Sequence, residues 1–466
     1  MLPSNARSTA LFIAILSGFL TPFDLSAVNI ALPTLAQEFS MDAIQMGWIS
    51  TAYLLASAVF LVPFGRIADI YGRKRVFATG LSIFTLASFL MILAPSALVV
   101  ILLRILQGFG SAMIFGTAVA ILTSVTPPEN RGKALGIYTT AVYLGLSMGP
   151  FFGGILTGLF GWRSIFAVNV PIGLVTVMLI LLFLKGEWAD CRGERFDLLG
   201  SIQYGLTLTC VMYGFSLLPE RGGFILVIAG ALMLAVFVAR ELRISDPLWN
   251  IRMFSKNRLF LFSNMAALIN YGATFAVTFF LSLYLQYIKG FSPEQAGMIL
   301  VVQPVVMALI SLAAGHLSDR IEPGKIASLG MGMTALSLAL LALTGSDTSL
   351  VIVIIILIIL GIGLGLFSSP NTSAIMGSVE RSCYGVASGT LGTMRLAGQM
   401  LSMGVAMMVL AIFVGNVLIT PGLYPAFLES MKVSMVISAA LCIAGIFFSL
   451  VRYAGTDTAG TCSKLP

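Results

Sequence analysis

Charge is scarce in this chain. Of its 466 residues only 10% are charged, whereas 58% are hydrophobic, and the mean hydropathy is +1.01. A soluble fold needs far more charge on its water-facing surface, so this composition excludes a soluble protein. It indicates a polytopic membrane protein.

Groups for metal, disulfide and nucleophilic chemistry are almost as rare. There is one histidine, His316, and five cysteines without paired spacing, which excludes a disulfide framework or a metal cluster. The segment GLSMG at 145–149 matches the nucleophile elbow of hydrolases, but it lies inside a predicted helix and has no histidine partner. We therefore expect no enzyme, no catalytic residue and no bound metal.

The basic residues are unevenly distributed between the two kinds of loop. Loops of one parity hold 20 Lys and Arg, and loops of the other hold four (Arg163, Arg221, Lys289 and Lys432). This asymmetry follows the positive-inside rule and makes the basic loops cytoplasmic. The net charge of +7 is thus explained by topology, and we expect no nucleic-acid partner.

Fourteen apolar runs are long enough to cross a bilayer, which takes about 20 residues per helix. They lie at 8–33, 46–65, 76–94, 98–124, 134–158, 164–184, 198–218, 222–240, 259–287, 293–316, 326–344, 349–374, 385–414 and 432–452. The first run is too long for a signal peptide and contains Asp24, so we interpret it as a spanning helix. Because the number of spans is even, we expect both termini on the cytoplasmic side. We expect a multi-pass protein of the inner or plasma membrane.

A charged loop is repeated in the two parts of the chain. GRIADIYGRKR at Gly65–Arg75 returns as GHLSDRIEPGK at Gly315–Lys325, and each copy follows a long apolar run. Eight spans separate the copies, so six-helix halves require two inserted helices. Duplication of this kind is typical of transporters. The predicted domains are 1–184, a linker with two spans at 185–258, 259–453 and a cytoplasmic tail at 454–466.

Apart from Glu294, the second residue of the run 293–316, Asp24 is the only one of 19 acidic residues inside a predicted span. A lone carboxylate in a low-dielectric medium is costly, so it favours taking up a proton. Arg104, in the fourth span, lies at a similar depth at about 1.5 Å per residue, so the two side chains could face each other. We interpret Asp24 as the proton carrier and Arg104 as its modulator; the alternative is a static buried ion pair that fixes helix packing.

Six segments in order resemble one known family. They are PFDLSAVNIALP at 22–33, RILQGFGSA at 104–112, GLSMGPFFGG at 145–154, GWRSIFAVNVPIG at 161–173, and the second-half segments SPNTSAIMGS and LGTMRLAGQ. Over nearly its whole length the chain resembles a major facilitator superfamily transporter of the fourteen-helix drug:proton antiporter family (EmrB/QacA type). The resemblance implies an all-α fold of 6+2+6 helices in two pseudo-symmetric halves around a central cavity.

The resemblance also assigns mechanical roles. It implies that the repeated loops form a conformational latch, with these residues: Gly65, Asp69, Gly72, Arg73, Arg75, Gly315, Asp319 and Arg320. Pro323 stands where the first copy has Arg73, so we expect the second latch to be weaker. Glycines four apart at Gly145, Gly149 and Gly153, with Pro150 beside them, predict a close helix contact. Only the resemblance links this glycine face to antiport.

The substrate cavity is assigned only in outline. Its candidate residues are polar groups among many Phe and Met: Asn29, Gln107, Asn270, Tyr271, Thr274, Gln286 and Arg395. Met and Phe suit an adaptable pocket for lipophilic ligands, but they are also ordinary lipid-facing residues. Arg395 has an alternative structural role, because its long side chain could reach a membrane surface.

These observations predict a proton-coupled antiporter that exports amphipathic or cationic small molecules by alternating access. No ATP-binding loop is present, so protons are the expected coupling ion and no cofactor is expected. Expected partners are a small lipophilic or cationic substrate and the lipid bilayer, and we expect a monomer; a periplasmic adaptor is left open. The alternatives are a dedicated exporter of one metabolite, lipid or antibiotic, and a non-transporting membrane sensor or scaffold.

Overall fold

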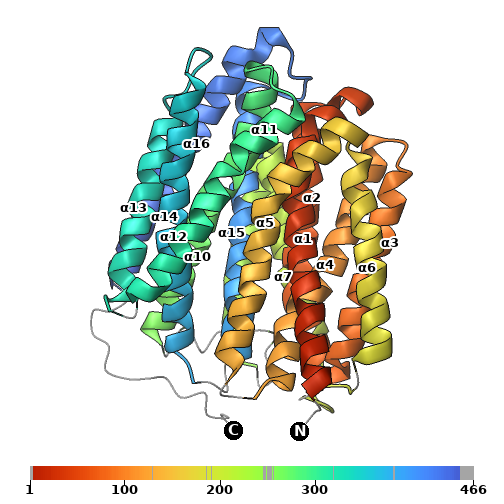
Figure 1. The fold of residues 1–466 in the computed structure, drawn as a ribbon. Helices are drawn as coiled ribbons and strands as arrows, with labels where there is room; N and C mark the ends of the chain where they lie inside the picture. Colours follow the sequence, from red (N-terminus) through yellow and green to blue (C-terminus); the bar gives the residue numbers. More distant parts are fainter. Residues whose placement is uncertain are drawn as a thin grey trace. The chain divides into compact units, whose positions relative to one another are not determined.

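The computed structural model describes residues 4–127, 130–184, 186–189, 191–244, 248, 254, 257–318, 320–380 and 384–451. Within these ranges every regular element is helical (Figure 1). The helices of the first part of the chain are α1 (Ser4–Phe39), α2 (Ala43–Tyr71), α3 (Arg73–Ile92), α4 (Ala97–Val125), α5 (Arg131–Phe160), α6 (Arg163–Phe183), α7 (Leu198–Leu217) and α8 (Arg221–Glu241). Those of the second part are α10 (Arg258–Leu283), η2 (Tyr284–Ile288), α11 (Pro293–Leu300), α12 (Val302–Ser318), α13 (Pro323–Leu341), α14 (Leu350–Gly377), α15 (Tyr384–Phe413), η4 (Pro421–Leu423) and α16 (Tyr424–Val451).

The described residues form fourteen spans that are long and apolar enough to cross a membrane, which confirms the predicted number. Several helices extend beyond their apolar runs. α1 passes through Pro33, because one missing N–H removes a single hydrogen bond from a long helix. α16 begins at Tyr424, eight residues before the predicted run at 432–452, because polar residues at its start are compatible with helical backbone.

The tenth span is not one continuous helix. It divides into α11 and α12 at Val301, and Pro304 follows three residues later. Proline cannot donate to the carbonyl of the residue four places earlier, here Leu300, so the helix is interrupted where that bond is missing. The prediction of a single run over 293–316 did not anticipate this break.

Local sequence explains where many helices begin. Asp42 caps α2 in a capping box with Gln45, and Ser292 does the same for α11 with Gln295. Ser96, Asp197 and other short polar side chains accept hydrogen bonds from the first turns that follow them. These caps satisfy backbone N–H groups that a helix leaves without partners.

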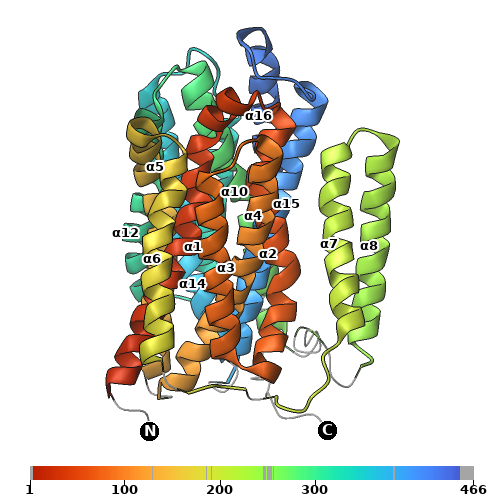
Figure 2. The ribbon, with the colours of Figure 1, turned by 90° about the vertical axis from the view of Figure 1, so that its right-hand side faces the viewer.

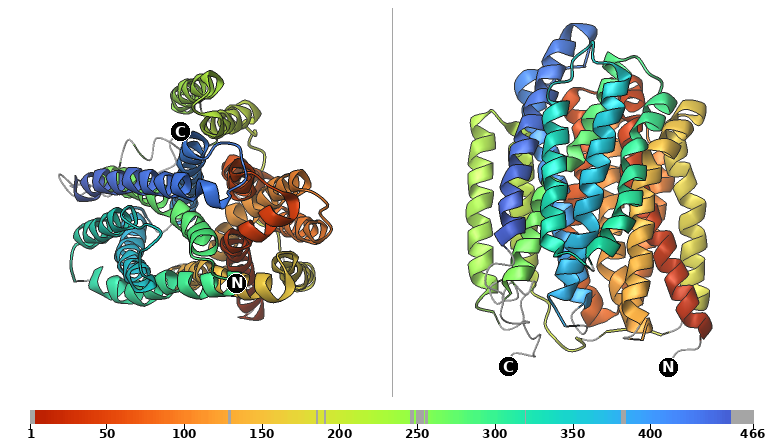
Figure 3. Two further views of the ribbon diagram at one scale, coloured as in Figure 1. Left: turned by 90° about the horizontal axis from the view of Figure 1, so that it is seen from above. Right: turned by 60° about the vertical axis from the view of Figure 1, so that its left-hand side comes forward.

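The chain divides into two compact units, Met1–Asn250 and Ile251–Pro466. In the first unit α1 packs on α4, α5 and α6, α2 packs on α4, and α3 packs on α4 and α6 (Figure 1). In the second unit α10 packs on α14, α15 and α16, α12 packs on α14, and α13 packs on α14 and α16 (Figure 3). The two sets of pairings correspond helix by helix, as expected of a duplicated six-helix bundle.

The closest helix contacts also correspond. A Cβ at Gly80 of α3 would lie 2.9 Å from the carbonyl oxygen of Gly110 on α4, and a Cβ at Gly330 of α13 would lie 2.6 Å from that of Gly363 on α14. Since a real Cβ almost never approaches so closely, all four positions need glycine for the backbones to meet.

The inserted helices α7 and α8 form a hairpin in the first unit (Figure 2). α7 contacts α2, where the buried Tyr204 hydroxyl donates to the Ala58 carbonyl at 3.2 Å. Where α7 begins and α8 ends, Arg240 of α8 makes two hydrogen bonds to the Asp197 carboxylate, at 2.6 and 2.8 Å. The hairpin is thus held together by this ion pair and by close glycine packing, since a Cβ at Gly223 would lie 2.8 Å from the Gly214 carbonyl oxygen. It is attached to α2 through α7.

Candidate functional site

Asp24 lies near the middle of α1 and is completely buried, with no side-chain surface exposed. Four helices pack on α1: α2, α4, α5 and α6. Its carboxylate is nevertheless fully hydrogen-bonded. A buried charge is tolerated only when it is paired in this way.

Arg104 of α4 supplies the opposite charge and is also completely buried. Its Nη1 lies 2.5 Å from Asp24 Oδ2, and its Nε donates to the Ile49 carbonyl of α2 at 3.1 Å. Its guanidinium carbon lies 4.3 Å from the ring centroid of Tyr53, a cation–π contact. The structure therefore brings Asp24 and Arg104 into contact, as their similar depth predicted.

Two amides complete the carboxylate's surroundings. Gln107 Nε2 and Asn169 Nδ2 donate to Asp24 Oδ1 at 3.1 and 2.7 Å. Gln107 is also held by its other contacts, accepting from Arg104 Nη1 at 2.6 Å and donating to Ser88 Oγ at 3.0 Å. We call Asp24, Ser88, Arg104, Gln107 and Asn169 the acid cluster; it joins α1, α3, α4 and α6.

Two polar atoms of the acid cluster are buried without a hydrogen-bond partner among the described residues. They are Arg104 Nη2, a donor, and Asn169 Oδ1, an acceptor. Unpartnered buried polar atoms in a folded protein call for an explanation, and a functional site is one. The acid cluster can thus hold Asp24 in its ionised form. Arg104 Nη2 and Asn169 Oδ1 leave one donor and one acceptor for a different set of hydrogen bonds.

Gln107 thus belongs to the acid cluster, although the sequence placed it among the cavity candidates. Asn29 lies one turn and a half further along α1, where its Oδ1 accepts from Ser50 Oγ of α2 at 2.7 Å. Both side chains are buried within the first unit.

The remaining cavity candidates lie in the second unit. Asn270 and Thr274 are on α10, where Thr274 Oγ1 donates to the Asn270 carbonyl at 2.7 Å. Gln286 lies in the π-helical turn η2 and donates to Ser282 Oγ at 3.0 Å. Tyr271 and Arg395 are half-buried on α10 and α15. Their assignment to a substrate cavity stays a prediction.

The first repeated loop is tightly constrained. Arg73 is largely buried and pairs with Asp69 at 2.6 Å, while its Nη1 donates to Ser124 Oγ at 2.7 Å. Gly72 ends α2 with a φ of +122°, a conformation that side chains disfavour. Gly65 faces Gly116 on α4, and Arg75 is exposed. The loop's charges are thus used within its own unit.

The chain that follows α6 lies across this loop. Glu187 accepts from the Lys74 backbone N–H at 2.8 Å, and the Trp188 carbonyl accepts from the Arg73 N–H at 2.8 Å. The Cys191 N–H donates to the Asp69 carbonyl at 3.0 Å, and Arg66 pairs with Glu194. We call Glu187, Trp188, Cys191 and Glu194 the linker strap. Burial raises the pKa of the Cys191 thiol, which disfavours its thiolate form.

The second repeated loop has fewer contacts among the described residues. A Cβ at Gly315 would lie 3.0 Å from Ser369 Oγ, and Arg320 is exposed. Asp319 lies outside the described residues. Lys325 pairs with Glu322 at 3.2 Å on an exposed face. The latch role of either loop stays a prediction.

The glycine face of α5 packs on α1. A Cβ at Gly145 would lie 2.3 Å from the Phe19 carbonyl oxygen, at Gly149 2.5 Å from Ser26 Cβ, and at Gly153 2.8 Å from Ala27 Cα. Pro150 sits within the same helix. These glycines therefore set the distance between α5 and the helix that carries Asp24.

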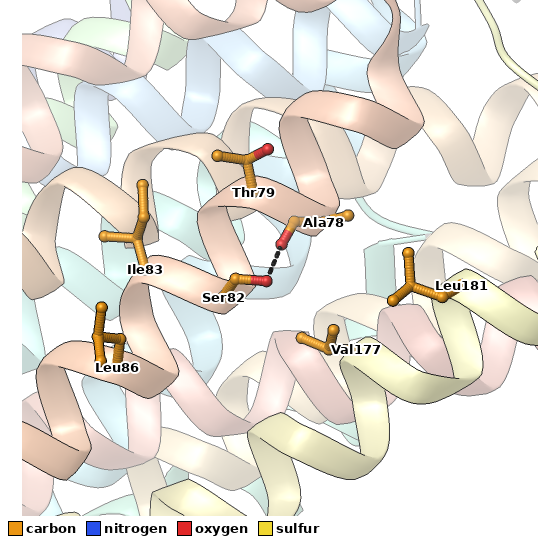
Figure 4. A pocket seen from close by; sticks show the side chains of 7 residues that line it. All are labelled: Ala78, Thr79, Ser82, Ile83, Leu86, Val177 and Leu181. Carbon is orange, nitrogen blue, oxygen red and sulfur yellow. Dashed lines mark hydrogen bonds between the residues drawn. The ribbon is translucent and has the colours of Figure 1, made fainter.

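A groove on the outer surface of α3 and α6 lies apart from the acid cluster. Figure 4 shows its seven lining residues, Ala78, Thr79, Ser82, Ile83, Leu86, Val177 and Leu181. Ser82 Oγ, one of its polar atoms, donates to the Ala78 carbonyl at 2.9 Å. No candidate site residue lines this groove, and its apolar lining suits contact with lipid.

Sequence reasoning missed Asn169, Ser88 and the linker strap. Asn169 is the only side-chain amide in the apolar run of α6. An amide inside a predicted span was the sequence feature that could have identified it as a site residue. The strap falls in the charged stretch after α6, which resembles an ordinary solvated connector.

Known proteins match both the sequence and the fold. Residues 14–403 match the family Major Facilitator Superfamily. The chain is 31% identical to the riboflavin transporter RibZ of Clostridioides difficile over 83% of this chain and 84% of that protein. It is 30% identical to the multidrug resistance protein Stp of Mycobacterium tuberculosis, over 65% of this chain and 57% of that protein, and 35% identical to the cephamycin export protein CmcT of Amycolatopsis lactamdurans, over 66% and 65%.

Among solved structures, a bacterial homologue of the human lysosomal transporter Spinster aligns with a TM-score of 0.72 at 19% identity, covering 97% of this chain and 98% of that one. The human organic anion transporter MFSD10 aligns with a TM-score of 0.64 at 16% identity, covering 96% and 100%. These likenesses concern the fold. With the family match over most of its length and the duplicated six-helix units, the chain belongs to the Major Facilitator Superfamily and is a multi-pass membrane transporter.

Proposed function

We propose that this transporter is a proton-coupled antiporter that exports amphipathic or cationic small molecules by alternating access. The observation that carries the proposal is the completely buried pair of Asp24 and Arg104 at the centre of the first unit. Charges inside a membrane span usually mark an ion or substrate pathway. Asp24 is the proton carrier in this proposal, and Arg104 adjusts how readily it takes up a proton.

The contacts of Arg104 support a pair that can separate. When Asp24 is protonated, the guanidinium still has the Ile49 carbonyl, the Gln107 amide oxygen and the Tyr53 ring. Loss of the Asp24 charge therefore does not leave Arg104 without partners.

The fourteen spans and the six motifs support the fourteen-helix drug:proton antiporter family (EmrB/QacA type) as the subfamily. The similarity to Stp, a multidrug resistance protein, supports multidrug export. In this proposal the basic loops and both termini face the cytoplasm of the cell membrane. The first repeated loop acts as a latch on that side, and the constraints on Gly72 and Arg73 support that role.

A second candidate is a dedicated exporter of one compound on the same fold. The names of RibZ and CmcT, a riboflavin transporter and a cephamycin export protein, favour it. Ligand-induced thermal stabilisation separates the two candidates. One tight ligand supports a dedicated exporter, and several weak, unrelated ligands support multidrug export.

The test uses purified protein in liposomes with a pH-sensitive dye inside and a panel of lipophilic cations outside. Adding a transported cation changes the internal pH in wild-type liposomes, and Asp24→Asn abolishes the change while the protein still incorporates. Ser82→Ala, on the outer groove of α3, serves as a control and keeps wild-type exchange. Full proton exchange by Asp24→Asn contradicts the role of Asp24, and no exchange with any ligand by the wild type contradicts antiport.

A further inference from the structure

The two polar atoms of the Asn169 side-chain amide have different surroundings. Its Nδ2 donates to Asp24 Oδ1 at 2.7 Å, while its Oδ1 is buried and has no hydrogen-bond partner among the described residues. An amide carries a donor and an acceptor on the same carbon, so a half-turn about its last bond exchanges them. The free acceptor thus belongs to a side chain that already touches the carboxylate.

Gln107, the other amide of the acid cluster, is fixed in one orientation. Its Oε1 accepts from Arg104, and its Nε2 donates both to Asp24 and to Ser88. A half-turn of Gln107 would place Nε2 against the Arg104 guanidinium and Oε1 against the Asp24 carboxylate. A half-turn of Asn169 breaks one bond only. Of the two amides, Asn169 is therefore the one that can turn.

We propose that Asn169 is a positioning residue that follows the protonation state of Asp24, an inference that rests on the proposed role of Asp24 as proton carrier. When Asp24 is ionised, Asn169 donates to it through Nδ2, as in the structure. When a proton binds to the carboxylate, the new O–H group donates to Asn169 Oδ1 after the amide turns. The proton is the only species added, and Asp24 keeps a hydrogen bond to α6 in both states.

Few other charged or titratable groups face Asp24 in the described part of the chain. Arg104 faces it from α4, and Tyr53 reaches the site from α2 beneath the guanidinium. On α5 Tyr138 lies against Gly18, six residues before Asp24. On α6 Arg163 lies at the start of the helix, where it pairs with Glu38. Asn169 is thus the contact from α6 that can respond to the proton.

An apolar residue at position 169 removes the hydrogen bond that α6 makes to both forms of Asp24, while Arg104 and Gln107 remain. The acid form then holds a buried O–H group without its acceptor, and one missing hydrogen bond corresponds to about a tenfold change in an equilibrium or a rate. We expect Asn169→Leu to slow proton-coupled exchange by about tenfold. Asn169→Ser keeps most of the rate, because a hydroxyl can donate or accept.

Infrared difference spectroscopy of the purified protein across a pH titration tests the proposal directly. The wild type shows a carboxylic acid C=O band that is absent in Asp24→Asn and therefore belongs to Asp24. In Asn169→Leu this band moves to higher wavenumber, because the acid O–H has lost its acceptor. Asn264→Leu is the matched control: Asn264 of α10 is also a buried asparagine whose Oδ1 has no partner in the described part of the chain, and its replacement leaves the Asp24 band in place.

The outcomes separate the two proposals. If the wild type has no band that depends on Asp24, the proton-carrier function fails and the role of Asn169 fails with it. If that band is present and Asn169→Leu leaves its position unchanged, the role of Asn169 is overturned while the proposed function stands. Asn169→Val replaces Asn169→Leu if the larger side chain prevents folding, with the same expected shift.

Discussion

The two units share a framework but differ in the chemistry at equivalent positions. Gly145 contacts α1 in the first unit, and Gly398 contacts α10 in the same way in the second. When α1 and α10 are aligned on these two contacts, Ala273 occupies the position of Asp24. Gly110 of the first unit and Gly363 of the second are equivalent in the same way. Six and three residues before Gly110 lie Arg104 and Gln107, and the residues at the same spacing before Gly363 are Leu357 and Leu360. All three residues of the second unit are apolar and largely buried.

Buried charge follows the same division. Among the described residues the buried charged side chains are Asp24, Arg73, Arg104 and Glu241, all in the first unit. The second unit buries neutral amides instead, including Asn264, Asn270, Asn371 and Gln399. The six-helix packing of the second unit is thus formed without a buried charge at the positions of Asp24 and Arg104.

The largest expected effect comes from giving the first unit the residues of the second. Arg104→Leu alone leaves a buried carboxylate without its cation and should cost about 3–5 kcal/mol of stability. Asp24→Ala with Arg104→Leu removes both charges and should recover most of that loss, while exchange stays abolished. Thermal unfolding in detergent measures both variants. A double variant as unstable as Arg104→Leu would show that the pair itself holds the bundle together.

The next effect distinguishes the two repeated loops. A Cβ at Gly72 would lie 2.5 Å from Glu187 Cδ, and the backbone there has a φ of +122°, so Gly72→Ala should cost about 1–3 kcal/mol. Glu322 occupies the same place in the second loop with a φ of −49°, and Glu322→Ala removes only an exposed ion pair, worth less than about 1 kcal/mol.

The loop comparison has a second measurement. Alkylation of Cys191 should be faster in Gly72→Ala than in the wild type, because the linker strap is displaced from the loop. Equal stability losses and equal alkylation rates in the two loop variants would mean that the strap does not constrain the first loop.

The smallest expected effect is a dependence of the first unit's stability on acid. Hydrogen bonds from Arg240 hold the pKa of Asp197 below its ordinary value. A depressed pKa in the folded state stabilises the protein above the unfolded value of about 4, and this contribution is lost as the pH falls further. The pair is partly exposed, so we expect less than about 1 kcal/mol.

Asp197→Asn checks this assignment. Its unfolding midpoint should vary less between pH 5 and pH 3 than that of the wild type. If the two curves have the same slope, other carboxylates dominate the acid response and the Asp197–Arg240 pair contributes little.

The sequence predicted what depends on local composition. Fourteen spans follow from apolar length, and the contact between Asp24 and Arg104 follows from their depth. It did not predict Asn169, because an amide costs less to bury than a charge and is less conspicuous in an apolar run. The linker strap was missed for another reason: its contacts join it to a loop more than 100 residues earlier, and three of them are hydrogen bonds to backbone groups of that loop, which no local pattern encodes.

The distance along the chain between Asp24 and Arg104 has a consequence for biosynthesis. The partners are 80 residues apart, and at about 5–20 residues per second a ribosome needs roughly 4–16 s to make the chain between them. During that interval α1 must enter the membrane with a carboxylate that has no partner, at a cost of about 2.5–3.5 kcal/mol. The Leu, Ile, Phe and Val residues of α1 supply about 0.3–0.6 kcal/mol each in the opposite direction. The apolar length of α1 thus allows Asp24 to be inserted into the membrane before Arg104 has been synthesised.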